Sequence, residues 1–356
     1  MSPSDAQVTL AIDAMGADSG PMEVMAGVAL AIDNFSSGVD YVLVGDENKI
    51  KPHLSDFPSL NQGSVRVHHA SQVIGMDEKP VASLKSKKDS SIVKALELVR
   101  EDEADAMLSC GNTGSLMAGG TIKLRTLEGI DRPALGTIWP GTKGYFVLLD
   151  AGANPEAKGI HLLHNAVLGA NYARVVLGIE NPKLGLLSIG TEEGKGNELI
   201  QESHLLLKQM HGLLNYQGLI EGFQMFENVV DVVVCDGFVG NIVLKACESL
   251  CKMIGAFLDE ELRRNTLRKT GALLSKGAFK GLKQRINPEH LGGAPLLGLR
   301  KPVVKAHGSS NRQQIEGAIR ITLDVVRKDM IGCILADARE ANELLQPIDL
   351  AMGTNA

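Results

Sequence analysis

The stretch VTLAIDAMGAD, residues 8–18, sets the pattern for the whole chain. Its first six residues are an apolar run that ends in Asp13, which predicts a short buried strand. A turn of small residues follows, and apolar side chains then recur with helical spacing at Val24, Val28 and Ile32. A strand, a tight turn and a helix in this order form the unit from which parallel α/β sheets are built.

The same unit recurs along the chain. Further strands are predicted at residues 41–44, 65–68, 104–108, 146–149, 183–189, 229–234 and 303–306. Strands that alternate with helices predict an α/β fold with a mostly parallel sheet covered by helices on both faces.

Six segments rich in Gly, Asn, Asp and Ser follow predicted strands, at residues 14–18, 109–114, 150–154, 190–197, 235–241 and 307–311. Each could be an ordinary turn, because these are the residues that turns use. Ligands of parallel sheets, however, bind beyond the carboxyl ends of the strands. Six such segments at one edge therefore favour a binding site.

Composition narrows the function classes. The chain has 356 residues, of which 44% are hydrophobic and 22% charged, so a folded globular protein is expected. A net charge of −6 and only 4% aromatic residues argue against a nucleic-acid partner. Five cysteines without zinc-type spacing predict neither a disulfide framework nor a zinc site. No secretory signal or spanning segment is recognisable, and a cytoplasmic location is expected.

Common catalytic motifs are absent from the sequence. No GxGxxG follows the first strand, no GxSxG or HExxH occurs, and residues 190–196 lack the spacing of a Walker A loop. Cys110, at a predicted strand-to-helix junction, is a candidate nucleophile whose pKa a helix N-terminus would lower. A small packing residue is the favoured interpretation of Cys110, because lone cysteines usually pack.

Cations offer a clearer direction. Residues 83–91 read SLKSKKDSS and place three lysines before a helix that Asp89 or Ser90 could cap. Lysines near helix N-termini favour anions, above all phosphate, although a solvated charged loop is the alternative.

Residues 250–285 differ in character from the remainder. Between positions 252 and 285 there are nine basic and three acidic residues, interleaved with apolar side chains. This pattern predicts a basic amphipathic helix pair with a turn near Gly271. Such a hairpin could pack on its own domain, bind a membrane surface or bind an acidic protein.

Five motifs in order resemble the bacterial phosphate acyltransferase family, the acyl-ACP:phosphate transacylases. They are AIDAMGAD at 11–18, the 85–91 stretch, SCGNTG at 109–114, GTEEGKGN at 190–197 and DGFVGN at 236–241. The resemblance implies transfer of a fatty acyl group from acyl carrier protein to inorganic phosphate. It also implies a homodimer and a three-layer α/β/α fold similar to phosphotransacetylases and isocitrate-dehydrogenase-like enzymes. Loose membrane association is implied too, near a membrane-bound acyl phosphate:glycerol-3-phosphate acyltransferase.

We therefore predict one catalytic α/β domain, residues 1–356, with the hairpin 250–285 within it. His307 and Ser309 are the predicted catalytic residues, since residues 300–309 resemble the catalytic loop of phosphotransacetylases. No metal and no cofactor is predicted. The predicted substrate-binding residues are Asp13, Gly16, Lys85, Lys88, Asn112, Thr113, Asn154, Lys195, Asn197, Asp236 and Asn241. Membrane or carrier contacts are predicted at Arg263, Arg264, Lys269, Leu273, Leu274 and Phe279.

Two positions depart from the family pattern. Ala17 stands where the family has Gly, and Cys110 where it usually has Ala; the second departure argues against an acyl-cysteine intermediate. Two other functions stay open. One is a metal-dependent decarboxylating dehydrogenase on a similar fold, for which Asp13 and Asp18 would be the metal ligands. The other is a non-enzymatic acyl-carrier or membrane docking protein.

Overall fold

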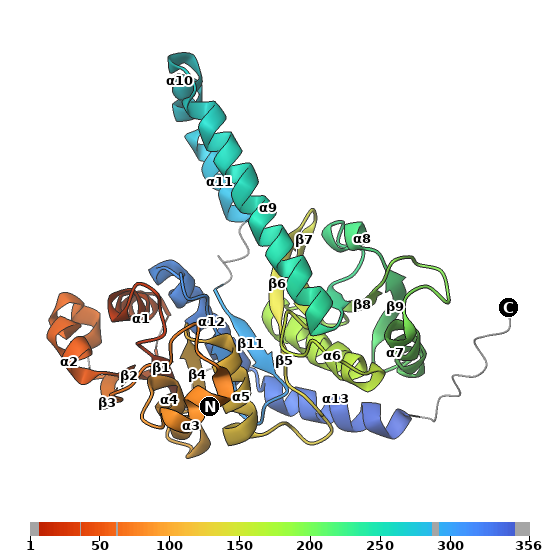
Figure 1. The fold of residues 1–356 in the computed structure, drawn as a ribbon, viewed down its shortest axis with the longest axis horizontal. Helices are drawn as coiled ribbons and strands as arrows, with labels where there is room; N and C mark the ends of the chain where they lie inside the picture. Colours follow the sequence, from red (N-terminus) through yellow and green to blue (C-terminus); the bar gives the residue numbers. More distant parts are fainter. Residues whose placement is uncertain (1–6, 36, 62, 287–291, 346–356) are drawn as a thin grey trace.

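The computed structural model describes residues 7–35, 37–61, 63–286 and 292–345. Its strands form two sheets that stand beside each other (Figure 1). The predicted α/β class with mostly parallel strands is confirmed, and the strands divide between these two sheets.

The first sheet has the order β3-β2-β1-β4-β12-β11-β5. Its first five strands are parallel, and β11 runs antiparallel to both neighbours. The central strands are almost wholly buried, which is why their sequences read as continuous apolar runs. The strands are β1 Val8–Asp13, β2 Val39–Gly45, β3 Val65–His69, β4 Ala106–Ser109, β5 Ala134–Leu135, β11 Ala294–Leu297 and β12 Val303–Lys305.

The second sheet has the order β6-β7-β10-β8-β9. Only the β6–β7 pair is antiparallel, and β7, β10, β8 and β9 run parallel. The strands are β6 Thr137–Gly141, β7 Gly144–Leu149, β8 Lys183–Leu187, β9 Asn215–Ile220 and β10 Val232–Val234.

Helices cover both faces of each sheet, so each forms three layers. In the first lobe, α1 Pro21–Phe35 and α12 Arg312–Arg327 pack on one face, and α4 Ser91–Arg100 and α5 Thr113–Leu124 on the other. In the second, α6 Gly159–Tyr172, α7 Glu198–Gln209 and α13 Met330–Leu344 share one core. The opposite face holds α8 Gly222–Phe226 and the start of α9 Gly237–Arg263. Short helices at the first lobe are α2 Glu47–Ile50 and α3 Pro80–Ser86.

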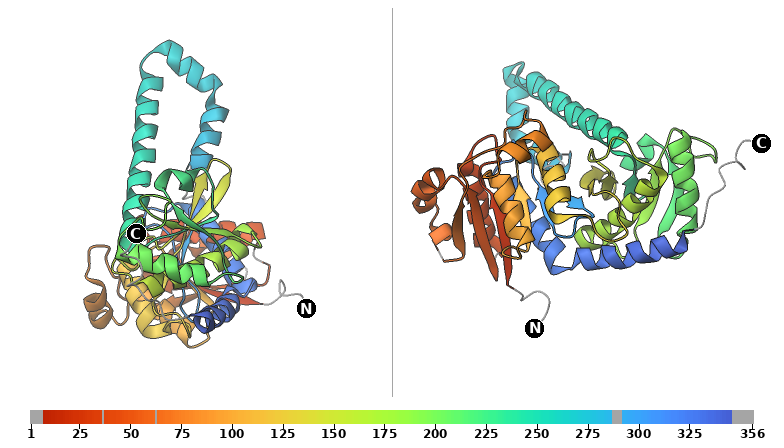
Figure 2. Two further views of the ribbon diagram at one scale, coloured as in Figure 1. Left: turned by 90° about the vertical axis from the view of Figure 1, so that its right-hand side faces the viewer. Right: turned by 60° about the horizontal axis from the view of Figure 1, so that its bottom comes forward.

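A helical hairpin projects from the two lobes (Figures 1 and 2). It consists of the outer part of α9, the tip helix α10 Thr266–Leu274, and α11 Lys276–Ile286. Gly271, expected near the turn, lies within α10, and Asn265 caps that helix by accepting a hydrogen bond from the Arg268 amide. The helical character of residues 250–285 therefore agrees with the sequence pattern, and most of the side chains described there are exposed.

Strand positions agree with the periodicity except at some ends. β4 begins two residues later than expected and β10 three later, and β8 ends at Leu187, so that Ile189 lies in the following loop. The antiparallel strands β5, β6 and β11 and the edge strand β9 were not predicted.

Candidate active site

A cavity of about 730 Å³ lies between the two lobes, beside the carboxyl ends of their parallel strands. Five of the six turn-like segments reach its wall, from both sheets. They contribute Asp18, Thr113, Gly114, Ala151, Gly152, Ala153, Asn241, His307, Gly308 and Ser310. The sixth segment, residues 190–197, contributes no lining residue within the described chain.

Asp13 and Gly16 lie behind this wall and stabilise the packing of the loops after β1 and β4. The Asp13 carboxylate is buried, accepts a 2.6 Å hydrogen bond from the Ser109 hydroxyl and accepts a second from the Met15 amide. Burial raises its pKa. A Cβ at Gly16 would lie 2.5 Å from the Gly111 amide nitrogen, so only glycine lets the loops after β1 and β4 pack this closely. Both predicted substrate-binding residues thus support the site from inside the fold.

Asn112 and Thr113 have different roles at the start of α5. Asn112 caps the helix, since its side-chain oxygen accepts from the Ser115 amide at 2.8 Å. Its side-chain amide donates to the carbonyls of Gly75, Met76 and Glu78, which fastens the neighbouring loop. Thr113, the first helical residue, is exposed and lines the cavity. Of the two, Thr113 is the one placed to contact a ligand.

Asn154 and Asp236 perform a similar supporting role in the second lobe. The Asn154 side chain donates to the Pro133 carbonyl at 2.7 Å and to the Asp150 carboxylate at 3.0 Å. Asp236 caps α9 by accepting from the amides of Phe238 and Val239. These contacts place Asn241, one turn along α9, at the cavity wall.

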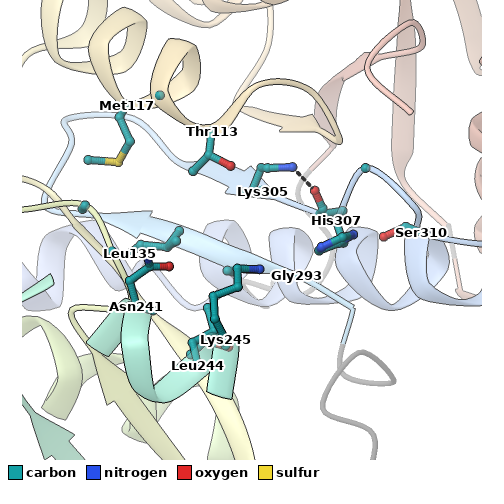
Figure 3. A pocket seen from close by; sticks show the side chains of 18 of the residues that line it. Thr113, Met117, Leu135, Asn241, Leu244, Lys245, Gly293, Lys305, His307 and Ser310 are labelled. Carbon is teal, nitrogen blue, oxygen red and sulfur yellow. Dashed lines mark hydrogen bonds between the residues drawn. The ribbon is translucent and has the colours of Figure 1, made fainter. Parts of the chain in front are cut away.

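His307 and Ser309 form a pair just after β12. The His307 Nδ1 lies 2.7 Å from the Ser309 hydroxyl and accepts a 3.2 Å hydrogen bond from the Ser309 amide. With Nδ1 as the acceptor, Nε2 is the ring nitrogen that can donate a hydrogen bond to an oxyanion. His307 lines the cavity, and its neighbour Ser310 does so as well (Figure 3).

Two lysines that the sequence reasoning missed lie in the cavity wall. Lys305, the last residue of β12, donates to the carbonyls of Cys110, at 2.9 Å, and Ala306. Lys245 enters from α9 on the opposite side and pairs with Glu248 at 2.9 Å (Figure 3). The signal in the sequence was a lysine that ends an apolar strand, directly before the turn-like segment 307–311.

The cavity has one polar and one apolar end. Lys305, Lys245 and His307 line one side of the cavity with the carboxylates Asp18 and Glu248, whereas Met117 and Leu135 lie toward the other side (Figure 3). Ala118, Ile138, Ala151 and Ala153 also line the cavity. Two further apolar side chains lie beside the polar groups, Met76 next to Gly308 and Asp18, and Leu244 next to Lys245. An anion at one end and a hydrocarbon chain at the other fit this arrangement.

Besides the supporting residues described above, five predicted catalytic or substrate-binding residues do not belong to the described cavity wall: Lys85, Lys88, Lys195, Asn197 and Ser309. Lys85, in the last turn of α3, and Lys88, after it, are exposed and do not belong to the described cavity wall. Lys195 and Asn197 lie in the separate 190–197 loop, where Asn197 caps α7. Ser90, one of the two expected positions, is the N-cap residue of α4, although its side chain makes no capping hydrogen bond.

Cys110 is packed in the core of the first lobe. Burial raises the pKa of its thiol to about 12, so the reactive thiolate is scarce at neutral pH. Cys110→Ala is therefore expected to retain most of the activity, measured as acyl phosphate formation. A stable acyl-enzyme in the wild-type protein, or complete loss of activity in a folded Cys110→Ala variant, would contradict transfer without a cysteine nucleophile.

Comparison with known proteins identifies the family. The family described as fatty acid synthesis protein matches residues 8–332. The chain belongs to the fatty acid synthesis protein family. A relative in this family, from Thermoanaerobacterium thermosaccharolyticum, is 43% identical over 91% of this chain and 95% of its own, and is named phosphate acyltransferase. Another of that name, from Geobacter sulfurreducens, is 42% identical over 90% of this chain and 91% of its own. The resemblance drawn from the five motifs is confirmed.

Solved structures show the same fold as this family member. A phosphotransacetylase from Staphylococcus aureus aligns with a TM-score of 0.57 and 16% identity, covering 90% of this chain and 96% of its own. A branched-chain phosphotransacylase from Enterococcus faecalis aligns with a TM-score of 0.53 and 15% identity, covering 90% and 99%. The predicted similarity to phosphotransacetylase folds is thereby confirmed.

Proposed function

We propose that this protein transfers a fatty acyl group from acyl carrier protein to inorganic phosphate. The observation that carries the proposal is the two-ended cavity between the lobes, which offers cations at one end and an apolar wall at the other. Membership of a family whose relatives are named phosphate acyltransferase supports the same reaction.

The chemistry asks little of the protein beyond positioning and charge stabilisation. A phosphate oxygen attacks the thioester carbonyl, the carbon–sulfur bond breaks, and the proton of hydrogen phosphate ends on the departing thiol. Thr113 and Asn241 are our candidates for holding phosphate, and His307 with Ser309 for stabilising the oxyanion or the leaving thiolate. Electrostatic stabilisation of this kind is commonly the largest contribution to catalysis.

Acyl phosphate formation tests the proposal directly. The purified protein is incubated with acyl carrier protein thioester and phosphate, and hydroxylamine traps acyl phosphate as a hydroxamate. We expect hydroxamate only when both substrates are present. Product that forms equally without phosphate, or none at all, would contradict the proposal.

The two other functions are not favoured by the comparisons. The Asp13–Asp18 pair does not support a dehydrogenase metal site, since Asp13 is buried under Gly16 and Ser109. In the part of the chain that the structure describes, no group of three His, Cys, Asp or Glu side chains is placed to hold a metal. A purely scaffolding protein would have no use for the two-ended cavity.

The hairpin supports a proposal about partners. Its tip helix exposes Leu273 and Leu274 to 71% and 83%, and Lys269 is exposed beside them. Arg263 and Arg264 pair with Asp259 and Glu261 on their own helix. We infer that the basic residues meet an acidic carrier protein or anionic headgroups, while Leu273, Leu274 and the half-buried Phe279 approach the acyl boundary of a membrane. In the described residues, no helix is long and apolar enough to cross a membrane.

A membrane-near location would suit the product. Acyl phosphate carries a fatty tail and is expected to pass to a membrane-bound acyl phosphate:glycerol-3-phosphate acyltransferase. Loose attachment of an otherwise cytoplasmic protein would serve that transfer.

The prediction of a single catalytic domain is supported by the hydrophobic core of the second lobe. This core includes Leu297, Ile321 and Val325, which belong to β11 and α12 of the first lobe.

A homodimer is supported by the outer part of α9. Leu250, Met253, Ile254 and Phe257 are exposed there with the spacing of one helix face. The arms formed by α9 and α11 diverge from each other (Figure 2), so a second copy of the chain is our candidate to cover this face. Sedimentation of the protein as a monomer at micromolar concentration would contradict this part of the proposal.

Glutamates at Leu273 and Leu274 should release the protein from anionic liposomes. Burial of a leucine side chain in the membrane contributes about 1.5–3 kcal/mol to binding, so the affinity for liposomes, measured by flotation, should fall at least roughly tenfold. Activity on soluble acyl-carrier substrate should persist, because α10 lies at the end of the hairpin away from the lobes (Figure 1) and contributes no residue to the described cavity wall. Ile122→Glu with Leu205→Glu, two exposed apolar positions on α5 and α7, adds the same charge elsewhere and serves as the control. Unchanged flotation of the tip variant would leave the hairpin without a membrane role.

A further inference from the structure

Lys305 occupies an unusual place for a charged side chain. It ends β12, a strand held between β4 and β11 inside the first sheet. An ammonium group has three protons to donate, and two of them go to the carbonyls of Cys110 and Ala306. Among the described residues, no further acceptor takes the third. Because Lys305 lines the cavity, that proton is available to a bound ligand.

The groups facing Lys305 come from several elements. Asp13 ends β1, Cys110 follows β4, Asp18 lies in the loop after β1, and Lys245 comes from α9. Asp13 and Cys110 do not supply a full counter-charge, since burial raises the pKa of both. Asp18 remains on the wall, and Lys245 shares its charge with Glu248. The direct hydrogen-bond partners of the Lys305 ammonium are two neutral carbonyls, and among the described residues no carboxylate accepts a hydrogen bond from it, although Asp18 is near. The ammonium is therefore able to bind an anion.

The surrounding donors suit a ligand with several oxygens. The exposed Thr113 and the imidazole of His307 line the same cavity as Lys305. Phosphate has several oxygens and can accept from three donors at once. The apolar wall at the opposite end accounts for the acyl chain.

We propose that Lys305 binds the phosphate nucleophile and holds it against the thioester carbonyl. This inference rests on the proposed acyl transfer to phosphate and assigns the residue that anchors its second substrate. Lys305 would then be a catalytic residue in direct contact with the reacting phosphate.

The role predicts a pH dependence. Burial is the main cause that lowers the pKa of Lys305 to about 8, and the nearby Lys245 lowers it further. Lys305 therefore carries its charge below pH 8 and loses it above. The kcat/KM for phosphate, which reports ionisations of the free enzyme, should fall as pH rises through about 8. Phosphate completes its own second ionisation at lower pH, so its charge does not cause this fall.

Steady-state kinetics of Lys305→Met and Lys305→Arg test the proposal. Lys305→Met should lower kcat/KM for phosphate roughly tenfold or more, the scale of a charge-assisted hydrogen bond, while KM for the acyl carrier stays near the wild-type value. Lys305→Arg keeps the charge at high pH, so its profile should lose the alkaline fall. Lys328→Met is the matched control, because Lys328 also donates to a backbone carbonyl, that of Val175, outside the cavity.

The outcomes separate the two levels of inference. Failure of the wild-type protein to form acyl phosphate would overturn the proposed function. A wild-type protein that forms acyl phosphate, with phosphate kinetics unchanged in Lys305→Met, would overturn the role of Lys305 alone. An alkaline fall that persists in Lys305→Arg, or a rise in KM for the carrier instead of phosphate, would also overturn it. If Lys305→Met does not fold, the pH profile of Lys305→Arg decides.

Discussion

Replacing Gly240 by alanine should displace the base of α9 from the cavity wall. A Cβ at this position would lie 1.9 Å from the carbonyl oxygen of Asp150 and 3.0 Å from the Cys235 sulfur. The first of these is backbone at the end of β7, which cannot move aside without disturbing the second sheet. We expect a loss of about 3 kcal/mol in the free energy of unfolding, at the upper end of overpacking effects. Activity should fall with it, because Asn241 and Lys245 on the next turn line the cavity.

Gly255→Ala on the same helix is the matched control. A Cβ there meets no atom within 4 Å, so alanine should stabilise α9 by about 0.5–1 kcal/mol through its better helix propensity. Both variants can be followed by thermal unfolding and by fluorescence of Trp139, the only tryptophan, which is buried in the second lobe. A Gly240→Ala protein that melts with the wild type would show that α9 is not tightly seated.

The DGFVGN motif at residues 236–241 predicts the location of the site but not the roles of its individual residues. The sequence predicts that Asp236 binds substrate, and in the structure its carboxylate caps α9. Gly237 and Gly240, one turn apart, let the helix lie against the loop 150–154 and the end of β7. The motif identified the right region of the molecule, since the segment does reach the cavity. Its individual residues mostly position that region, and only Asn241 faces the cavity.

The predicted strands are those with long apolar runs, and the missed ones have none. β5 has two residues and β6 reads TIWPG, so neither offers a periodic signal. Both lie where the lobes adjoin, and tertiary pairing fixes them: β5 pairs with β11, and β6 with β7. The division into two sheets follows from these pairings, which local sequence does not encode.

The lysines of the cavity wall could not be predicted from local sequence either. Lys85 and Lys88 stand in a dense basic cluster and drew the prediction of phosphate contacts, yet both face solvent away from the described cavity wall. Lys245 and Lys305 are single lysines 60 positions apart, on a helix and at a strand end. The two lysines reach one cavity only because the two lobes of the fold lie against each other. Spacing in the sequence cannot reveal such a pair.

Replacing Asp150 by alanine should cause the largest loss of stability at the site. This buried carboxylate directly follows β7, and it accepts hydrogen bonds from four backbone amides, at Leu135, Gly152, Ala153 and Asn154, and from the Asn154 side chain. Leu135 belongs to β5 of the first sheet, so Asp150 also ties the two lobes together. Burial raises the pKa of Asp150, and the amide hydrogen bonds oppose that rise.

Without the carboxylate, five donors lose this acceptor, and three of them are buried: the amides of Leu135 and Asn154 and the Asn154 side chain. Each unsatisfied donor costs about 1–3 kcal/mol, so we expect Asp150→Ala to lower the free energy of unfolding by at least about 3 kcal/mol even if water reaches several of them. Ala151, Gly152 and Ala153 form part of the cavity wall, so activity should fall beyond detection. Asp105→Ala is the control, since that carboxylate accepts a 2.7 Å hydrogen bond from the Thr9 amide at an exposed position and should cost about 1 kcal/mol or less. The free energies of unfolding of both variants can be measured by chemical denaturation. Equal losses for Asp150→Ala and Asp105→Ala would mean that the loop 150–154 keeps its shape without the Asp150 carboxylate. The shape of the cavity wall would then depend on the packing of α9 alone.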